Sequence, residues 1–248
     1  MKISIITVVY NNDKTIRDAI NSIFSQDYQQ IEYIIIDGGS KDNTVSIIKE
    51  NQNKITKFIS EPDNGLYDAM NKGLRLATGD VIGILNSDDL YFDKNVISTV
   101  MNEFQINEKV DLVYGDLVYV KQDDTNIVIR NWKSKSYYKR FFENGNVPPH
   151  PSLFIKKRVY DVVGFFSLNY KLAADYELML RIFKKHKFNS IYINKVFVKM
   201  RLGGATNQSF LNIKNQNIEI LNAWKDNNLK PPFYLMLFRV FKRLIQFI

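Results

Sequence analysis

Short apolar runs alternate with helical patterns along the first third of the chain. The apolar runs occupy residues 3–10, 33–37, 55–60 and 81–85. Between them, apolar residues recur every three or four positions over residues 16–24, 44–50 and 66–77, which is the spacing of an amphipathic helix. Runs that are apolar on both faces and alternate with such helices are typical of parallel strands inside a sheet. The pattern therefore predicts an α/β fold with a Rossmann-like, mostly parallel central sheet and helices on both faces.

The composition indicates one main domain with an appended element, because the chain has 248 residues and 45% of them are hydrophobic. There is no cysteine, so disulfides and thiolate metal sites are excluded. Oxygen atoms or the two histidines, His150 and His186, would have to hold any metal, which implies a hard cation. The first apolar run is short and ends at Asn-Asn-Asp, so we interpret it as a strand of a cytoplasmic protein and not as a secretory signal.

The net charge of +8 suits nucleic acid, an anionic membrane and phosphorylated ligands equally well. No recognised nucleic-acid-binding module, with aromatic residues interleaved among basic ones, is visible in the sequence. We therefore expect no nucleic-acid partner.

Polar residues follow three of the predicted strands directly. They are Tyr10-Asn11, Asp37-Gly38-Gly39-Ser40 and Asn86-Ser87-Asp88-Asp89. Because ligands of such sheets bind beyond the carboxyl ends of the strands, we expect these groups to form one site. Each group also has a local explanation as a helix cap or a turn, and Ser40 would be the N-cap of the helix that follows it.

Asp88 and Asp89 are adjacent acids at the end of an apolar strand, where like charges repel each other. A cation is therefore expected beside them, and carboxylate-held Mg²⁺ or Mn²⁺ would neutralise the diphosphate of a nucleotide. The glycine-rich phosphate loops of dinucleotide-binding and P-loop proteins are missing from the sequence. The pattern favours a nucleoside-diphosphate site of another class.

Four stretches of the chain carry a family resemblance. In chain order they read SIITVVYNN, IIIDGGSKDNT, EPDNGLYDAMNKGLRLATGDVIGILNSDD and KLAADYELMLRIF. Through them most of residues 3–187 resembles the inverting family 2 glycosyltransferases of the bacterial surface-polysaccharide type. The resemblance implies a GT-A nucleotide-diphospho-sugar transferase fold over residues 1–207, with a nucleotide-binding half (1–110) and an acceptor-binding half (111–207). A helical extension (208–248) would follow.

The resemblance also implies which residues bind the donor and the metal. The residues expected at the donor are Thr7, Val8, Tyr10, Asp37, Asn86 and Asp88. The first three would line the pocket for the base, and Asp37 would contact the uracil or ribose. The NSDD segment would occupy the acidic motif that binds Mn²⁺ or Mg²⁺, with Asp88 as the preferred ligand. Asp89 would partly replace the acid that is Asn86 in this chain.

Asp175, in LAADYELMLR, occupies the position of the family's catalytic base. There it would take the proton from an acceptor hydroxyl while that oxygen attacks the anomeric carbon of the sugar. The alternative is that Asp175 only caps the following helix, and Glu177 is interpreted as structural. His150, between prolines, would border the acceptor side or simply lie in a turn. Arg201 would begin a basic loop (201–206) that binds the donor by closing over its diphosphate, or would lie in an ordinary exposed turn.

The segment after Pro231-Pro232 is apolar except for one basic helical stripe. That stripe contains Arg239, Lys242, Arg243 and Gln246. A helix over residues 233–248 is too short and too charged to span a bilayer comfortably, so we expect it in the membrane interface, with its cations among anionic headgroups. The alternative is a helix docked on the catalytic domain or on another subunit. Membrane contact would place the protein peripherally at the inner face of the cell membrane, beside acceptors carried by a polyprenyl diphosphate.

Three functional hypotheses follow. The first is metal-dependent, inverting transfer of a hexose or N-acetylhexosamine from a UDP-sugar to a saccharide or lipid-linked saccharide, in surface polysaccharide biosynthesis. The second is nucleotidyl transfer by a similar fold, although the glycine-rich basic loop of such enzymes is absent after the first strand. The third is a non-catalytic module that binds a nucleotide sugar or a membrane. The sequence leaves the oligomeric state open.

Overall fold

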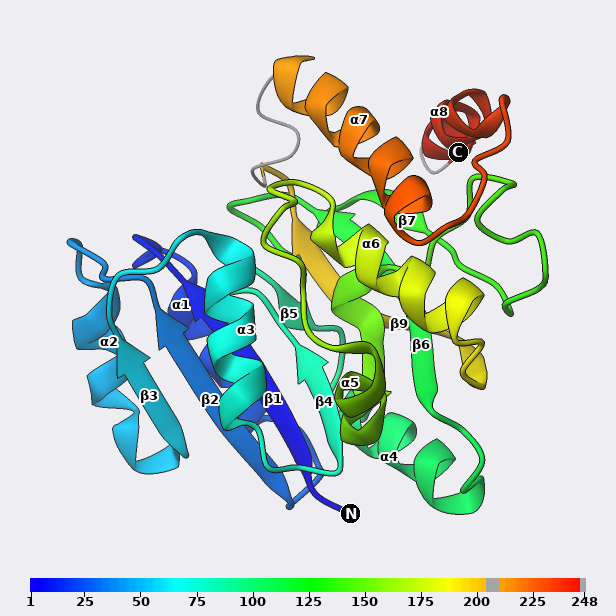
Figure 1. The fold of residues 1–248 in the computed structure, drawn as a ribbon. Helices are drawn as coiled ribbons and strands as arrows, with labels where there is room; N and C mark the ends of the chain where they lie inside the picture. The colour runs from blue at the N-terminus through cyan, green and yellow to red at the C-terminus, as the bar shows by residue number, and fades with distance from the viewer. Residues whose placement is uncertain (204–209, 246–248) are drawn as a thin grey trace.

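The computed structural model describes residues 1–203 and 210–245. In this part of the chain nine strands form one sheet in the order β3-β2-β1-β4-β8-β6-β9-β5, with β7 paired to β6 (Figure 1). The strands are β1 (Ile3–Val9), β2 (Ile31–Asp37), β3 (Lys57–Ser60), β4 (Val81–Ile84), β5 (Leu90–Tyr91), β6 (Leu112–Val120), β7 (Val128–Trp132), β8 (Leu153–Lys156) and β9 (Ser190–Arg201). The helices are α1 (Ile16–Phe24), α2 (Thr44–Glu50), η1 (Gln52–Lys54), α3 (Leu66–Leu76), α4 (Val96–Ile106), η2 (His150–Ser152), α5 (Lys157–Val163), α6 (Ala174–Met179), η3 (Leu180–Lys185), α7 (Phe210–Asp226) and α8 (Leu235–Ile245).

The first half of the sheet is parallel. β1 pairs in parallel with β2 and β4, and β2 pairs in parallel with β3. β8 is antiparallel to β4 and β6, whereas β6 and β9 are parallel to each other. β1 is buried along its whole length because both faces are covered, and this burial explains its unbroken apolar run. The predicted fold class, with a mostly parallel sheet between helices, is confirmed.

Helices pack on both faces of the sheet. α3, α5 and α6 cover one face, and α1, α2 and α4 cover the other (Figure 1). Alternate strand residues therefore enter different cores: Ile6 packs in the core of α3, and Ile5 packs in the core of α1. Gly73 lets α3 approach the sheet closely, because a Cβ at this position would overlap with the Ile6 side chain. α2 begins at Thr44 after an Asn cap, so the prediction of Ser40 as its N-cap is wrong.

The C-terminal extension consists of α7 and α8, which lie at the end of the molecule toward which β1, β2 and β4 point (Figure 1). α7 packs on α6, and the indole N–H of Trp224 donates a hydrogen bond of 3.0 Å to the Tyr176 hydroxyl. α8 is anchored by Leu235, which is buried, and by Arg239, whose guanidinium lies over the ring of Tyr176. Within the described residues, no helix combines the length and the apolar character needed to cross a membrane.

Candidate active site

A cavity of about 1060 Å³ opens at the carboxyl edge of the parallel strands. Its walls come from the end of β1, the loop after β4, the start of α3, β7 with the segment after it, and the helices α6, α7 and α8. Six predicted site residues line it: Val8, Tyr10, Asn86, Asp88, His150 and Asp175. Four others are outside its lining: Thr7, Asp37, Asp89 and Arg201.

Thr7 and Asp37 are fully buried and hold the protein's own structure. The Thr7 hydroxyl accepts a hydrogen bond of 3.2 Å from the Tyr33 hydroxyl. The Asp37 carboxylate accepts bonds from the backbone N–H of Ser40 at 3.1 Å and from the Ser60 hydroxyl at 2.6 Å. Asp37 therefore fixes the turn after β2. Neither Asp37 nor Thr7 lines the cavity, where they were expected to contact the donor.

Asp63 is a cavity-lining acid that the sequence pattern did not reveal. It lies in the turn before α3, where its Oδ1 accepts a hydrogen bond of 2.8 Å from the backbone N–H of Gly65. Gly38 makes room for it, because a Cβ on Gly38 would collide with the Asp63 carboxylate. In the sequence, the Gly38-Gly39 turn and the acidic turn that contains Asp63 are far apart. Neither pattern predicts that the two turns are in contact.

Asp88 and Asp89 occupy different environments although they are adjacent. Asp88 is partly buried and lines the cavity, whereas Asp89 is fully buried behind it. Asp89 Oδ2 accepts a hydrogen bond of 3.1 Å from the amide of Asn86. Burial raises the pKa of Asp88, and burial together with the charge of Asp88 raises the pKa of Asp89 well above its usual range.

The atoms of this acidic loop fit a hard divalent cation. Asp89 Oδ1 and Asn86 Oδ1 are buried, and neither has a hydrogen-bond partner among the residues that the structure describes. In the same part of the chain there is no group of three acidic, histidine or cysteine side chains that would form a complete protein cage. Mg²⁺ and Mn²⁺ suit such a partial set, because Mg²⁺ usually takes one or two carboxylates and completes its shell with water and substrate phosphates.

Arg201 is buried beneath the acidic loop, with 5% of its side chain exposed. Its guanidinium donates to the backbone oxygen of Asp88 at 2.9 Å and to that of Gln122 at 3.1 Å, and it forms an ion pair of 2.5 Å with Asp18. The expectation that Arg201 faces the donor is therefore not met, because its guanidinium is engaged by these contacts and positions the Asp88 backbone. Residues 204–206 of the expected closing loop are outside the described residues.

Asp175 lies in the first turn of α6 and faces the cavity. The N-cap of α6 is Ala173, so Asp175 does not have the capping role that was its alternative. The Tyr67 hydroxyl donates a hydrogen bond of 3.1 Å to Asp175 Oδ1. Burial and the charge of Asp175 raise the pKa of Tyr67 well above its usual range, so the phenol stays protonated and remains a donor.

The segment that leads into α6 is held by Glu219 of α7. The Glu219 carboxylate accepts hydrogen bonds from three successive backbone N–H groups, those of Lys171 at 3.0 Å, Leu172 at 2.8 Å and Ala173 at 2.9 Å. α7 therefore fixes the approach to Asp175 from outside the stretches that carried the sequence resemblance.

His150 and Glu177 flank this region in different ways. His150 lines the cavity and packs edge to face with Phe166, with their ring centres 5.6 Å apart. Burial lowers the pKa of His150, against the opposing effect of the Asp175 charge, so the imidazole is neutral at neutral pH. Glu177 is buried in an ion pair of 2.8 Å with Arg181, which is a structural role.

The basic side of α8 faces the cavity, where Arg239 and Lys242 belong to the lining. The large apolar side chains of Leu237, Phe238 and Phe241 are exposed outside the cavity lining, as is Phe233 just before the helix, whereas the exposed Val240 belongs to the lining. The expectation that the basic stripe lies among lipid headgroups therefore does not hold for Arg239 and Lys242. The side chain of Arg243 and the whole of Gln246 are outside what the structure describes.

Comparison with known proteins agrees with this architecture. The model of the family described as Glycosyl transferase family 2 matches residues 4–162. A PGL/p-HBAD biosynthesis glycosyltransferase of Mycobacterium bovis is 28% identical over 208 residues, which cover 82% of this chain and 78% of the relative.

Two solved structures are similar at low sequence identity. Glucosyl-3-phosphoglycerate synthase of Mycobacterium tuberculosis, in complex with Mg²⁺ and UDP, has a TM-score of 0.66 at 16% identity, covering 94% of this chain and 81% of that one. S. aureus TarS 1-349 in complex with UDP-GlcNAc also has a TM-score of 0.66 at 16% identity, covering 99% of this chain and 73% of that one. This likeness supports the fold, and the expected GT-A fold is confirmed.

Proposed function

The chain belongs to glycosyl transferase family 2 and is a glycosyltransferase, and we propose that it moves a sugar from a UDP-sugar to an acceptor hydroxyl with inversion at the anomeric carbon. The observation that carries this proposal is that Asp88 and Asp175 line one cavity at the carboxyl edge of the sheet. One carboxylate can serve the diphosphate end of a donor, and the other can serve an attacking hydroxyl.

Asp175 is the general base in this proposal. It accepts the proton of the acceptor hydroxyl while the hydroxyl oxygen forms a bond to the anomeric carbon, and the bond from that carbon to the UDP oxygen breaks. One displacement from the face opposite the leaving group inverts the configuration. The hydrogen bond from Tyr67 orients the Asp175 carboxylate, and neutral His150 lies on the acceptor side, where it can donate or accept a hydrogen bond.

Asp88 would hold a divalent cation at the donor end. Mg²⁺ or Mn²⁺ bound there would neutralise the charge that develops on the departing diphosphate. Asp89 and Asn86 would support this cation through their unpartnered Oδ1 atoms, and Arg201 fixes the Asp88 backbone. Val8 and Tyr10 form the wall on which the base of the nucleotide lies.

A UDP-sugar is the favoured donor because the two similar structures are described as complexes with UDP and with UDP-GlcNAc. The favoured acceptor is a saccharide, free or lipid-linked, of surface polysaccharide or glycolipid biosynthesis. The similarity to a glycosyltransferase named for PGL/p-HBAD biosynthesis supports that class.

We place the protein peripherally on an anionic membrane, in the cytoplasm at the inner face of the cell membrane. The support is the exposed apolar side of α8, where Leu237 is 72% exposed, and the neighbouring Phe233, which is 99% exposed. Isolated exposed apolar residues are common, but a cluster of this size on one helix marks an interaction surface.

The test is UDP release from a panel of UDP-sugars with Mn²⁺, measured for the wild type and for Asp175→Asn. We expect the substitution to lower kcat by about a hundredfold or more, because the amide cannot accept the proton. Asp161→Asn is the matched control, since Asp161 is 62% exposed on α5 and outside the cavity lining.

Other outcomes distinguish the alternatives. Unchanged turnover in Asp175→Asn would overturn the assignment of the base. Release of a sugar 1-phosphate in place of UDP would indicate transfer of the nucleotidyl group, and donor binding without turnover by any acceptor would indicate a non-catalytic module.

A further inference from the structure

We propose that Trp132 of β7 binds the saccharide acceptor by stacking its indole ring against a pyranose ring inside the large cavity. This inference rests on the proposed function and deepens it, because it names the residue that recognises the acceptor through the apolar face of a sugar.

Two aromatic rings of the cavity are accessible to a ligand. Tyr10 is 60% exposed and Trp132 is half-buried, whereas the other Phe and Tyr side chains of the described lining are buried. Those buried lining residues are Tyr67, Tyr119, Phe141 and Tyr176. Tyr10 belongs to the wall that is proposed for the nucleotide base, so Trp132 is left for a different ring.

The β6–β7 pair fixes the orientation of the Trp132 ring. Tyr119 of β6 lies opposite Arg130 of β7, and Trp132 is two residues further along β7, so the three side chains share one face of the sheet. The Trp132 and Tyr119 rings are stacked at an interplanar angle of 1°, with their centres 6.3 Å apart. The Arg130 guanidinium carbon lies 3.7 Å from the centre of the Tyr119 ring. Tyr119 is therefore a rigid support for the indole.

Hydrogen bonds also order the chain that follows Trp132. Asp116 Oδ1 accepts bonds from the backbone N–H of Ser134 at 2.7 Å and from the Tyr192 hydroxyl at 2.9 Å. The Tyr114 hydroxyl donates to the backbone oxygen of Lys135 at 2.8 Å. A ring that is held in place before the ligand arrives loses little conformational entropy on binding.

Polar groups next to the ring suit the hydroxyls of a sugar. Asn131, Lys133 and Ser134 are neighbours of Trp132 in the sequence, and they line the same cavity. Ser134 Oγ is buried and has no hydrogen-bond partner among the residues that the structure describes. Because buried polar atoms are normally hydrogen-bonded, this hydroxyl points to a partner that a ligand supplies.

This combination of groups matches the chemistry of a pyranose. One face of such a ring consists of C–H bonds, and its hydroxyls project from the edge. The face of an indole is the negative side of its quadrupole and attracts the weakly positive hydrogens of the C–H bonds. An accessible indole beside hydroxyl-binding groups therefore suits a sugar ring.

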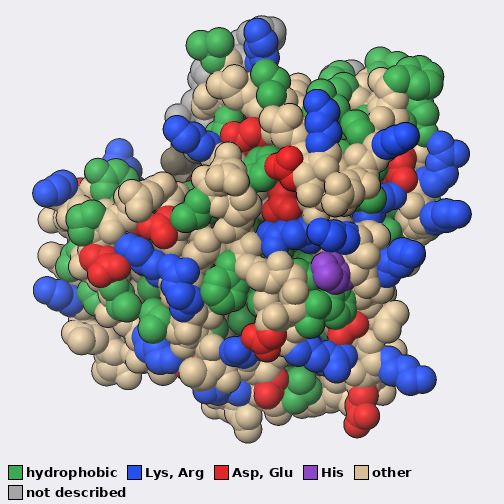
Figure 2. Space-filling model, viewed as in Figure 1, with side chains coloured by type: hydrophobic (Ala, Val, Ile, Leu, Met, Phe, Trp, Pro, Cys, Tyr) green, Lys and Arg blue, Asp and Glu red, His purple; other side chains and the backbone are tan. Residues whose placement is uncertain are grey.

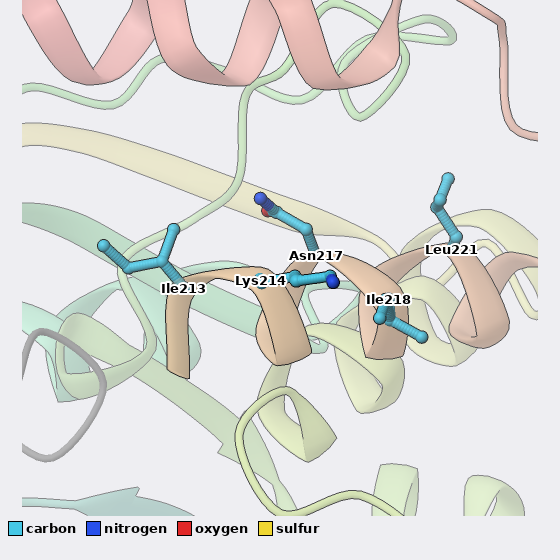
Figure 3. Close-up of a pocket in the computed structure, with 5 residues that line it drawn as sticks. All are labelled: Ile213, Lys214, Asn217, Ile218 and Leu221. Atoms are coloured by element: carbon cyan, nitrogen blue, oxygen red, sulfur yellow. The ribbon is translucent and has the colours of Figure 1, made fainter. Parts of the chain in front are cut away.

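Other apolar surfaces of the protein are of a different kind. On α7, the cavity-lining residues Ile213 and Asn217, which Figure 3 shows, carry aliphatic and amide groups in place of a ring. Hydrophobic side chains also gather at the α8 end of the molecule, as green atoms in Figure 2, but Phe233 and Phe241 there are outside the cavity lining. Within the described lining, the stacking role therefore falls to Trp132.

Tryptophan fluorescence tests the proposal, because the two tryptophans of the chain lie in different environments. Trp224 is 1% exposed and bonded to Tyr176, whereas Trp132 lines the cavity. Cellotriose, chitotriose and mannotriose are titrated separately into the protein in the presence of UDP and Mn²⁺, so that the nucleotide already occupies its own site. We expect a saturable blue shift with at least one trisaccharide, kept in Trp224→Phe and lost in Trp132→Phe.

Calorimetry with the same trisaccharide measures the contribution of the ring. Trp132→Ala should weaken binding about tenfold, and Trp132→Phe, which keeps a smaller ring, should weaken it about threefold. The affinity for UDP should stay at the wild-type value in both variants, which also shows that they are folded. Phe92→Ala is the matched control, because Phe92 is 40% exposed and lies outside the cavity lining.

The absence of a saturable shift with all three trisaccharides would overturn the proposal, as would wild-type trisaccharide affinity in both Trp132 variants. A shift produced by UDP alone, together with weaker UDP binding in Trp132→Ala, would assign the ring to the nucleotide and would overturn it too. Failure of the proposed function would appear separately, as absent UDP release in the donor panel.

Discussion

The Tyr67 hydroxyl and the Asp175 carboxylate form a hydrogen bond of 3.1 Å between α3 and α6, across 108 positions of the chain. Asp175 belongs to a short helix whose approach is fixed by Glu219 on the other side. The proposed base is thus oriented by a residue of α3, and the segment leading to it is held by a residue of α7. Neither contact follows from the spacing of residues around Asp175.

Tyr67→Phe should lower kcat about tenfold, since it removes one hydrogen bond to a charged group and leaves the ring in place. The KM for the donor should stay near the wild-type value, because the bond serves the acceptor side. Initial rates at varied donor and acceptor concentration measure both constants. Tyr28→Phe is the control, as the Tyr28 hydroxyl donates to a backbone oxygen far from the cavity. A rise in donor KM with unchanged kcat would contradict the positioning role.

The architecture was predictable because its main signal is local. β1 is buried on both faces, and burial of this kind leaves a continuous apolar run in the sequence. The edge that carries the site followed from the same reasoning, since parallel strands bring their carboxyl ends together and Tyr10 and Asp88 do meet at one cavity.

The expected site residues that lie outside the cavity lining are polar side chains whose partners come from elsewhere in the fold. The sequence around Asp37 suits a ligand contact or a turn, and it does not show that the Ser60 hydroxyl of the neighbouring strand donates a hydrogen bond to Asp37. Arg201 forms an ion pair with Asp18, which is 183 positions away in the chain. The orientation of α8 is set by the contact between Arg239 and the ring of Tyr176 in α6. The basic stripe of the sequence could not show this contact, and so could not show that the basic side of α8 faces inward.

Asn86→Asp should strengthen metal binding by about tenfold, because it adds a further carboxylate beside Asp88 and Asp89. The same change should destabilise the metal-free protein by about 1–3 kcal/mol, since the bond of 3.1 Å from the Asn86 amide to Asp89 becomes a contact between two acids. Thermal unfolding with and without Mn²⁺ and UDP measures both effects. Asn53→Asp, at an exposed position, is the control. Metal affinity no greater than that of the wild type would argue against the acidic loop as the cation site.

Glu32 gives the fold a defined dependence on pH. It is 4% exposed in β2, and its carboxylate accepts bonds from the Ser4 hydroxyl at 2.6 Å and the Thr78 backbone N–H at 2.7 Å, with the Lys57 ammonium at 3.2 Å. Burial acts to raise its pKa, but these partners outweigh burial and lower the pKa to about 2. A lowered folded-state pKa means that the stabilisation is complete above the unfolded-state pKa of about 4.5 and is lost as the pH falls toward about 2.

Glu32→Gln should therefore lower the free energy of unfolding at neutral pH by about 3 kcal/mol and flatten its dependence on pH between about 4.5 and 2. Urea unfolding at a series of pH values measures this change. Glu50→Gln is the control, because its pair with Arg17 is exposed on both sides and such pairs contribute about 1 kcal/mol or less. A parallel pH profile for Glu32→Gln and the wild type would show that Glu32 titrates normally.

Leu237→Asp should weaken association with anionic vesicles about tenfold or more, because burying one leucine side chain in an apolar phase is worth about 1.5–3 kcal/mol. Leu237 is 72% exposed on α8 and lies outside the lining of the cavity, so the substitution leaves the proposed acceptor site intact. Sedimentation with vesicles measures the bound fraction, and Ile106→Asp introduces the same charge at an equally exposed position on α4. Since Arg239 and Lys242 face inward, the apolar side of α8 has to provide most of the contact in the described part of this helix. Full-length wild-type protein that stays entirely in the supernatant with anionic vesicles would contradict the peripheral location.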